Sequence, residues 1–290
     1  MSFRTVVISK QSKLSYKNSF LVVKQEKDEK YIHLSEIDTI IIDNPTSVVT
    51  CFLLKELSLN KINIIFCDEK HNPFGELASF YSRHNSSKQI KKQISWKQPD
   101  KDSLWREIIK NKIINQAMLL RKVDDDKYEM LLNYANDVEI GDITNREGHA
   151  AKVYFNALFG NDFIRHSEQE TNAALNYGYA ILLSTINKEV KANGFLTELG
   201  INHTNEFNQF NLSCDLMEPF RVIIDNFVYY NKERKLDSDY KLDVVNLFNH
   251  TYKYQSKMYT LKDIIKLYVK KTLDSIENIE NYEAFIYGEE

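Results

Sequence analysis

Three places in the chain bring acids, a histidine and an arginine together in patterns that could support chemistry. In the stretch NREGHAAKVYF, Arg146 and Glu147 precede a glycine and a histidine. In LGINHTN, His203 follows a glycine within a polar segment. In SCDLMEPFR, Asp215 and Glu218 stand three residues apart. Two carboxylates and an imidazole suit a divalent cation such as Mn²⁺ or Mg²⁺, and the imidazole favours Mn²⁺.

Each of these places also has a structural interpretation. Glu147 could be a carboxylate that interacts with a helix dipole, because the apolar residues that follow it recur at helical spacing. His203 could be a hydrogen-bonding loop residue, and Asp215 could cap a helix with Glu218 completing a capping box. Spacing alone does not bring residues 147, 203 and 218 together. The residue types therefore leave a metal site and three separate structural roles open.

The first 82 residues read as a small β-rich domain. Runs rich in β-branched residues predict strands, namely TVVIS, SFLVVKQ, YIHLSEIDTIIID and KINIIFCDE. The charged segment KQEKDEKY predicts a hairpin between two of them. The stretch PTSVVTCFLLKELSLN has apolar residues at helical spacing and predicts one amphipathic helix. Several strands and one helix predict a sandwich-like domain over residues 1–82 that makes the dimer contact.

Residues 101–290 read as a larger helical domain. DSLWREIIKNKIINQAMLLRKV is amphipathic at helical period, with Asp102 or Ser103 as its N-cap. Similar patterns continue to TLKDIIKLYVKKTLDSIENI, and Gly194 is placed to end one of the helices. The C-terminal NYEAFIYGEE is acidic and aromatic and reads either as a frayed tail or as a partner contact. The predicted fold class is α+β, a β-rich domain followed by an all-α C-terminal catalytic domain.

Residues 83–100, between the two domains, are basic. No Asp or Glu occurs from Leu77 to Pro99. The same stretch contains five cations, Arg83, Lys88, Lys91, Lys92 and Lys97, and the rings of Tyr81, His84 and Trp96. Such a patch can neutralise phosphates while its rings stack on bases, although charge runs are often only solvated. The stretch reads equally as a basic linker or as a DNA contact.

Bulk properties exclude several classes of protein. The chain has 290 residues, 43% hydrophobic and 27% charged, with a formal net charge of -3, as in ordinary globular proteins. No GxxxxGK[ST] or GxGxxG motif occurs, which disfavours a nucleotide-driven enzyme. The sequence shows neither a signal peptide nor an apolar run long enough to span a bilayer. Three cysteines without metal-type spacing predict reduced thiols and a cytoplasmic protein.

The motifs NREGHAAKVYF, GINH and LSCDLMEPFR, in this order, resemble the signature of the CRISPR-associated spacer integrase, the larger of the two universal adaptation proteins. The sequences of the DLMEPFR motif and of the Asn-Arg-Glu-Gly start are most similar to those of family members that accompany single-protein (type II) effectors. The resemblance extends over the chain, since a β-rich N-terminal domain followed by a helical domain with these motifs is the family's architecture.

The resemblance implies a role for each motif residue. Glu147, His203 and Glu218 match the metal ligands of the family, and Asp215 matches its supporting acid, so all four are expected in the catalytic site with Mg²⁺ or Mn²⁺. Arg146 is expected to hold a phosphate by a bidentate guanidinium contact. Because the basic stretch lacks acids, Arg83, Lys88, Lys91 and Lys92 are also expected to contact DNA, as is Arg221.

The reaction that the resemblance implies is a DNA transesterification, in which the 3′-hydroxyl of a short foreign duplex attacks the edge of a repeat. The expected partners are double-stranded DNA (the protospacer and the CRISPR leader-repeat), a second copy of the chain, and the small ferredoxin-like adaptation protein in a four-plus-two complex. Whether the effector nuclease and an accessory adaptation protein join that complex stays open. The alternatives are a stand-alone metal-dependent endonuclease acting on branched DNA and, more distantly, a non-catalytic helical DNA-binding or scaffold protein.

Overall fold

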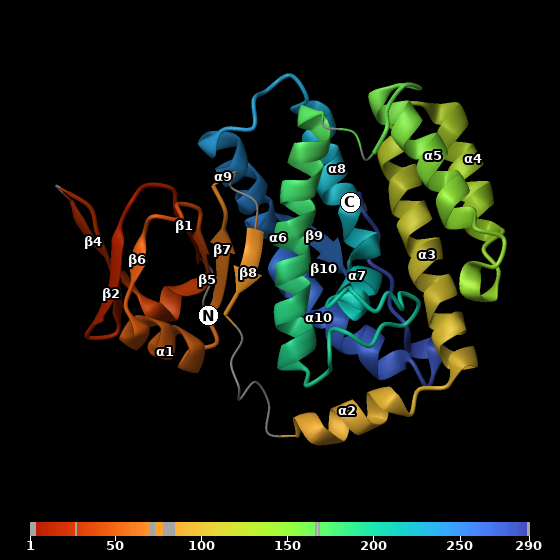
Figure 1. Cartoon of the computed structure of the whole chain (residues 1–290). Helices are drawn as coiled ribbons and strands as arrows, with labels where there is room; N and C mark the ends of the chain where they lie inside the picture. Colours follow the sequence, from red (N-terminus) through yellow and green to blue (C-terminus); the bar gives the residue numbers. More distant parts are fainter. Residues whose placement is uncertain are drawn as a thin grey trace. The chain divides into compact units, whose positions relative to one another are not determined.

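The chain forms two compact units of different composition. The structure, a computed structural model, describes residues 4–26, 28–69, 73–77, 85–165, 167 and 169–288. The first unit comprises residues 1–82 and 237–246, and the second comprises residues 83–236 and 247–290 (Figure 1). The first is built mainly from strands and the second mainly from helices, so the α+β fold class is confirmed.

Two four-stranded sheets make up most of the first unit. The strands are β1 (Arg4–Ile8), β2 (Lys13–Lys17), β3 (Phe20–Lys24), β4 (Glu29–His33), β5 (Ile37–Ile42), β6 (Val48–Val49), β7 (Asn63–Cys67) and β8 (Pro73–Glu76). One sheet has the order β1-β5-β7-β8, with β1, β5 and β7 parallel and β8 antiparallel. The other has the order β4-β3-β2-β6, and its β3–β4 pair is the hairpin predicted around KQEKDEKY.

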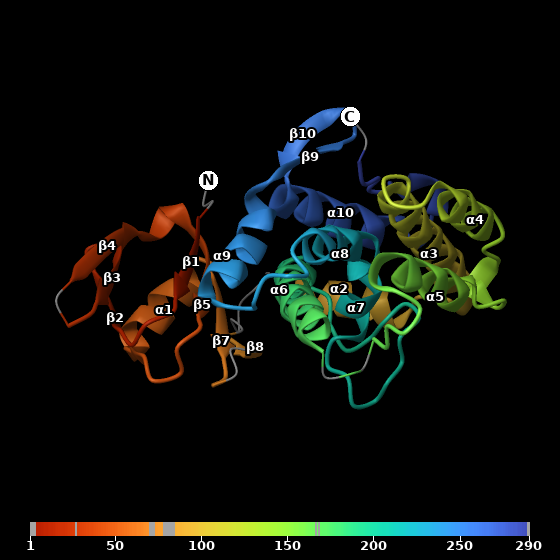
Figure 2. The same ribbon diagram turned by 90° about the horizontal axis from the view of Figure 1, so that it is seen from above.

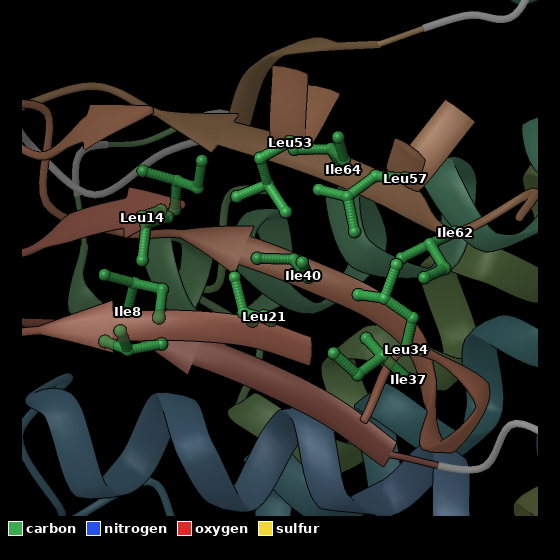
Figure 3. Close-up of a cluster of buried hydrophobic side chains, with 12 residues drawn as sticks. Ile8, Leu14, Leu21, Leu34, Ile37, Ile40, Leu53, Leu57, Ile62 and Ile64 are labelled. Atoms are coloured by element: carbon green, nitrogen blue, oxygen red, sulfur yellow. The ribbon is translucent and has the colours of Figure 1, made fainter. Parts of the chain in front are cut away.

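The core of the first unit lies between these sheets. Leu14 and Leu21 from one sheet and Ile40 and Ile64 from the other belong to the same buried cluster (Figure 3). Helix α1 (Cys51–Leu59) adds Leu53 and other apolar side chains to it. Because both sheets contribute their apolar faces to one core, the arrangement is sandwich-like.

The predicted helix PTSVVTCFLLKELSLN is shorter than expected. Thr50 is the N-cap of α1 and its hydroxyl accepts the backbone N–H of Leu53 at 3.4 Å. Val48 and Val49, placed in the helix from their spacing, instead form β6 beside β2. Adjacent β-branched residues favour a strand over a helix, which explains this difference.

Helices dominate the second unit. They are α2 (Ser86–Ile94), α3 (Gln98–Leu120), α4 (Asp125–Asn136), α5 (Arg146–Phe159), α6 (Glu170–Ala192), α7 (Asn211–Met217), α8 (Arg221–Tyr230) and α10 (Leu261–Ser275). Helices α3, α4 and α5 pack side by side, while α6 packs with α7, α8 and α10 (Figures 1 and 2). The short 3-10 turn η3 (Glu218–Phe220) packs against α3 and connects the two groups.

Three predicted boundaries in this half differ from the structure. Residues 83–100, interpreted as a linker, contain α2 and the first turn of α3. Helix α3 begins at Gln98 rather than at Asp102 or Ser103, because Pro99 occupies its first turn, where a proline is tolerated. Helix α9 (Ser238–Asn246), expected in the helical domain, groups with the first unit.

The expectation of an all-α C-terminal domain is also corrected by a small hairpin. Strands β9 (Thr251–Tyr254) and β10 (Lys257–Thr260) pair antiparallel across Gln255 and Ser256, whose φ angles are 52° and 62°. Two successive residues with positive φ form the tight turn that suits a two-residue hairpin. The predicted stop of α6 at Gly194 is confirmed by its φ of 82°.

The described helices do not have the length and hydropathy of membrane-spanning segments. Among the helices that the structure describes, none is both long enough and apolar enough to cross a bilayer.

Candidate metal centre

Glu147 lies in the first turn of α5, and its neighbours cap that helix. The carboxylate of Asp142 accepts the backbone N–H groups of Arg146 at 2.8 Å and of Glu147 at 3.1 Å. The side chain of Asn145 accepts the N–H of Gly148 at 3.2 Å, and a Cβ at Gly148 would lie 2.7 Å from that side chain. Because other groups satisfy these donors, the Glu147 side chain is not used as a cap.

The carboxylate of Glu147 points instead to Lys112 on α3. The Lys112 Nζ lies 2.6 Å from Glu147 Oε1 and 2.6 Å from Glu218 Oε2. The contact with Glu218 is a short ion pair. The Lys112 side chain is only 11% exposed, so one buried ammonium joins carboxylates from α5 and η3.

Arg221 holds the other oxygen of Glu218. Its Nε lies 3.0 Å and its Nη2 2.9 Å from Glu218 Oε1, and its guanidinium stacks 4.6 Å above the ring centroid of Tyr179. Burial opposes ionisation of Glu218, but the charges of Arg221 and Lys112 outweigh it and lower the pKa of this carboxyl to about 2. Glu218 is therefore a fixed, ionised carboxylate, with Oε1 held by Arg221 and Oε2 facing Lys112.

Asp215, on α7, organises the loop that carries His203. Its fully buried carboxylate accepts the backbone N–H groups of Ile201 at 2.6 Å, Asn202 at 3.1 Å and His203 at 3.1 Å. A Cβ at Gly200 would lie 2.3 Å from the carbonyl oxygen of His203 and 2.8 Å from Asp215 Oδ2, so this loop closes only around a glycine. The capping role that sequence allowed for Asp215 is not found, since it lies within α7.

The imidazole of His203 is oriented by the same carboxylate. Its Nδ1 lies 2.5 Å from Asp215 Oδ1, and its ring meets that of Trp105 edge-on at 5.8 Å. The hydrogen bond to Asp215 raises the pKa of His203, against the lowering effect of burial. When Nδ1–H donates to Asp215, the Nε2 lone pair of the neutral ring is free to bind a metal.

Helix α2 anchors the loop on its other side. Gln93, which is buried, donates from Nε2 to the carbonyl oxygens of Leu196 at 2.9 Å and Leu199 at 2.8 Å, and its Oε1 accepts the N–H of Leu196 at 2.9 Å. An open hollow of about 540 Å³ lies between α2 and this loop, and His203 is part of its wall. One side of His203 thus borders this hollow.

The residues present fit a divalent cation by type and, in part, by position. Two carboxylate oxygens, one from Glu147 and one from Glu218, converge on one cation, the Lys112 ammonium. Within the described residues, no three His, Cys, Asp or Glu side chains are close enough to hold one ion. The structure thus brings Glu147 and Glu218 together around a cation position. It does not place His203 close enough to bind the same ion.

The residues predicted to contact DNA lie in different surroundings. Arg83 lies outside the described residues, as do Tyr81 and His84. Lys88 and Lys91 are exposed on α2. Lys92, on the same helix, pairs with Glu277 at 3.4 Å. Arg146 pairs with Asp137 at 3.6 Å and lies 5.6 Å from the ring centroid of Tyr134, and Arg221 is used to hold Glu218.

Sequence reasoning missed Lys112 and Gln93. Lys112 lies on a helix face that also carries Ile108, Ile109 and Ile113, all buried. A lysine on such an apolar face was the available signal, because a buried charge needs a partner. Gln93 gave no signal, since it stands among lysines in a polar stretch and its partners are more than 100 residues away.

Comparison with known proteins agrees with these motifs. A family model described as "CRISPR associated protein Cas1" matches residues 5–244. The "CRISPR-associated endonuclease Cas1" of Neisseria meningitidis serogroup C (strain 8013) is 35% identical over 235 residues, which cover 81% of this chain and 77% of that protein.

Two solved structures share the fold at low sequence identity. The chain of a "Casposase bound to integration product" has a TM-score of 0.80 at 19% identity, with 100% of this chain and 94% of that chain covered. A "Cas6-RT-Cas1–Cas2 complex" has a TM-score of 0.77 at 19% identity and matches 99% of this chain, which spans 36% of that longer chain. With a family model that matches most of its length and a relative of 35% identity, the chain belongs to the CRISPR-associated Cas1 family.

Proposed function

We propose that this chain is a CRISPR adaptation integrase and endonuclease that inserts short foreign DNA into a CRISPR array by metal-dependent transesterification. The observation that carries the proposal is the convergence of Glu147 and Glu218 on one cation position, within motifs that belong to the Cas1 family. Further support comes from the names of the relatives compared above, an endonuclease and a casposase bound to its integration product.

Glu147, Glu218 and His203 would hold the cation, Mg²⁺ or Mn²⁺. When bound, such an ion polarises the scissile phosphate and stabilises charge on the attacking and leaving oxygens. Asp215 orients the imidazole through Nδ1, and Arg221 fixes one oxygen of Glu218. Rigid mounting of this kind keeps ligands within the tolerance that phosphoryl chemistry requires.

The reaction exchanges one phosphodiester bond for another and therefore needs no external energy source. The 3′-oxygen of the incoming duplex forms a bond to a phosphorus at the edge of the repeat, and the bond from that phosphorus to its original 3′-oxygen breaks. The attacking hydroxyl gives up its proton and the leaving oxygen takes one up. With water as the attacking group, the same site hydrolyses the bond, so both integrase and nuclease activities are expected from it.

The proposed assembly contains two such sites held apart. We expect a homodimer formed through the first unit, bridged by the small ferredoxin-like adaptation protein into a four-plus-two complex on the protospacer and the leader-repeat. A solved complex with a similar chain has Cas2 in its name, which supports the small partner. We expect the protein to act in the cytoplasm beside a type II effector, because the DLMEPFR motif is most similar to family versions that accompany such effectors.

The test is an integration assay with the purified chain and its small partner. Short duplexes with free 3′-hydroxyls are mixed with a plasmid that carries a leader and one repeat, with Mn²⁺ or Mg²⁺. Wild type is compared with Glu147→Ala and with His149→Ala, an exposed neighbour on the same helical turn that serves as control. Joined products at both repeat edges are expected for wild type and the control and should be absent for Glu147→Ala.

Other outcomes have distinct meanings. Cleavage without joining, again lost in Glu147→Ala, would favour a stand-alone endonuclease that acts on branched DNA. Joining that persists in Glu147→Ala would overturn the role given to this residue. DNA binding with neither cleavage nor joining in any metal would favour a scaffold.

A further inference from the structure

The Lys112 ammonium occupies the position in which a cation would meet both carboxylates. It lies 2.6 Å from one oxygen of Glu147 and 2.6 Å from one oxygen of Glu218, so those oxygens cannot be further apart than twice that distance. A divalent ion binds carboxylate oxygens at about 2.0–2.2 Å. Two oxygens bound to one ion at that distance lie within about 4.4 Å of each other, so one ion would bind both only if they lie that close and the ammonium has left the space between them.

The surroundings determine which of these contacts can exchange. Arg221 approaches Glu218 with two nitrogens on Oε1 and stacks on Tyr179, so that contact is rigid. Lys112 carries its charge on a flexible four-carbon stem, and it meets each carboxylate through a single nitrogen. The lysine is thus the exchangeable cation of the pair, and the arginine is the fixed one.

We propose that Lys112 is an internal counter-ion that holds Glu147 and Glu218 together in the metal-free protein and that the incoming metal must displace it. The inference rests on the metal site proposed above. Without a cation, two ionised carboxylates in a largely buried place would repel each other, so the metal-free protein needs the lysine. With a divalent ion present, ion and ammonium compete for the same oxygens, and the lysine therefore weakens metal binding. Lys112 is in this sense a positioning residue that raises the metal concentration needed for activity.

The experiment compares Lys112→Met, which keeps the length of the stem but removes the charge, with Lys110→Met on the same helix. Thermal unfolding is recorded without metal and with saturating Mn²⁺, and the Kd of Mn²⁺ is measured by the loss of its free electron paramagnetic resonance signal. For Lys112→Met we expect a metal-free Tm lower by about 5 °C or more, a Kd lower by about tenfold or more, and a Tm largely restored by Mn²⁺. Lys110→Met should match wild type in all three measurements.

The outcomes separate this inference from the proposed function. If Lys112→Met binds Mn²⁺ with the wild-type Kd, and Glu147→Ala abolishes that binding, the inference is overturned and the metal site stands. If Glu147→Ala changes Mn²⁺ binding in neither the wild-type nor the Lys112→Met background, the metal site itself is overturned together with the inference.

A second measurement uses the wild-type chain, in case Lys112→Met does not fold. Reductive methylation of lysine amines is followed by mass spectrometry with and without saturating Mg²⁺. Lys112 should react slowly without metal and several-fold faster with it, while Lys110 reacts at the same rate in both conditions. Equal rates for Lys112 would overturn the inference.

Discussion

The carboxylate of Asp225 on α8 is fully buried and accepts hydrogen bonds from two tyrosine hydroxyls, Tyr154 on α5 and Tyr179 on α6. Burial raises its pKa to about 6, although the two hydroxyls and the charge of Arg221 act in the opposite direction. Arg221 also stacks on Tyr179 and holds Glu218. Asp225 is therefore linked to the candidate metal centre through Tyr179 and Arg221.

This raised pKa predicts a specific pH dependence of stability. An aspartate in the unfolded chain has a pKa of about 3.9, so between pH of about 4 and about 6 the unfolded state loses a proton that the folded state retains. The contribution of Asp225 is therefore fully present below pH of about 4. It is lost as the pH rises to about 6, at up to about 1.4 kcal/mol per pH unit and about 3 kcal/mol in total.

Asp225→Asn removes this titration. The free energy of unfolding of wild type minus that of the variant should therefore fall by about 3 kcal/mol at most between pH of about 4 and about 6, and stay level well above that range. Denaturant unfolding at several pH values measures the difference, with the exposed Asp162→Asn as control. A difference that is flat, or that rises with pH, would contradict the raised pKa.

At the scale of elements, α2 presents two faces with different chemistry. Gln93 faces inward and holds the loop before His203 by three hydrogen bonds, whereas Lys88 and Lys91 face solvent. Loss of Gln93 would remove these three hydrogen bonds to the loop backbone, each of which contributes about 0.5–1.5 kcal/mol. Loss of the two lysines would remove only charge that could neutralise phosphates.

Substitutions on the two faces of α2 should therefore have different effects on strand joining and on DNA binding. Gln93→Ala should lower the rate of strand joining by about tenfold or more and leave DNA affinity nearly unchanged. The double variant Lys88→Ala and Lys91→Ala should weaken DNA binding and reduce the slope of log affinity against log salt by about 2. Filter binding at several salt concentrations and the joining assay separate these effects.

Gln89→Ala on the same helix is the control for Gln93→Ala. If the two variants slow strand joining equally, the anchoring role of Gln93 is wrong. If the double lysine variant keeps the wild-type salt slope, α2 is not the DNA contact that its composition predicts.

The elements that sequence predicted well were those with local signals. Runs such as FLVVK gave strands, and Gly194 gave a helix end, since both depend on neighbouring residues only. Strand β2, KLSYK, was not foreseen because it contains no β-branched run, and it is stabilised by pairing with β3 and β6. Tertiary pairing of this kind overrides local propensity.

For the candidate site, the motifs identified the acids and the histidine but not what surrounds them. The resemblance implied a supporting role for Asp215, but the hydrogen bond between Asp215 and His203 was not predicted. Lys112 lies 35 residues before Glu147, and the two meet only through the packing of α3 against α5. Such a contact leaves no spacing pattern in one sequence, so it could not be predicted.

At the scale of the whole molecule, the C-terminal segment is part of the second unit's core. The interpretation of this segment as a frayed tail is wrong for Phe285, which is fully buried and stacks on Phe220 at 4.8 Å. The Asn115 side chain donates to the carbonyl oxygens of both Phe285 and Pro219 at 2.8 Å. The end of the chain thus supports the turn that carries Glu218.

Phe285→Ala should destabilise the second unit and weaken the site together. Removal of a fully buried phenylalanine costs about 3–5 kcal/mol, and here the cavity would lie beside η3. We expect a lower Tm and a higher Kd for Mn²⁺ at a temperature where the variant is folded. Met258→Ala, with a side chain 62% exposed, is the control. A Tm drop without a change in Kd would show that the tail does not position Glu218.

The membership of α9 in the first unit has a consequence for synthesis on the ribosome. Tyr240, Val244 and Val245 of this helix are buried, and α9 packs on β1, yet about 150 residues of the second unit are translated between it and the earlier strands. The first unit cannot finish folding as it emerges, and must wait with an apolar surface uncovered until residue 246 has left the exit tunnel. A nascent chain stalled before α9 would therefore be bound by chaperones that recognise exposed apolar surface. A fragment of residues 1–82 would lack α9, which belongs to the first unit.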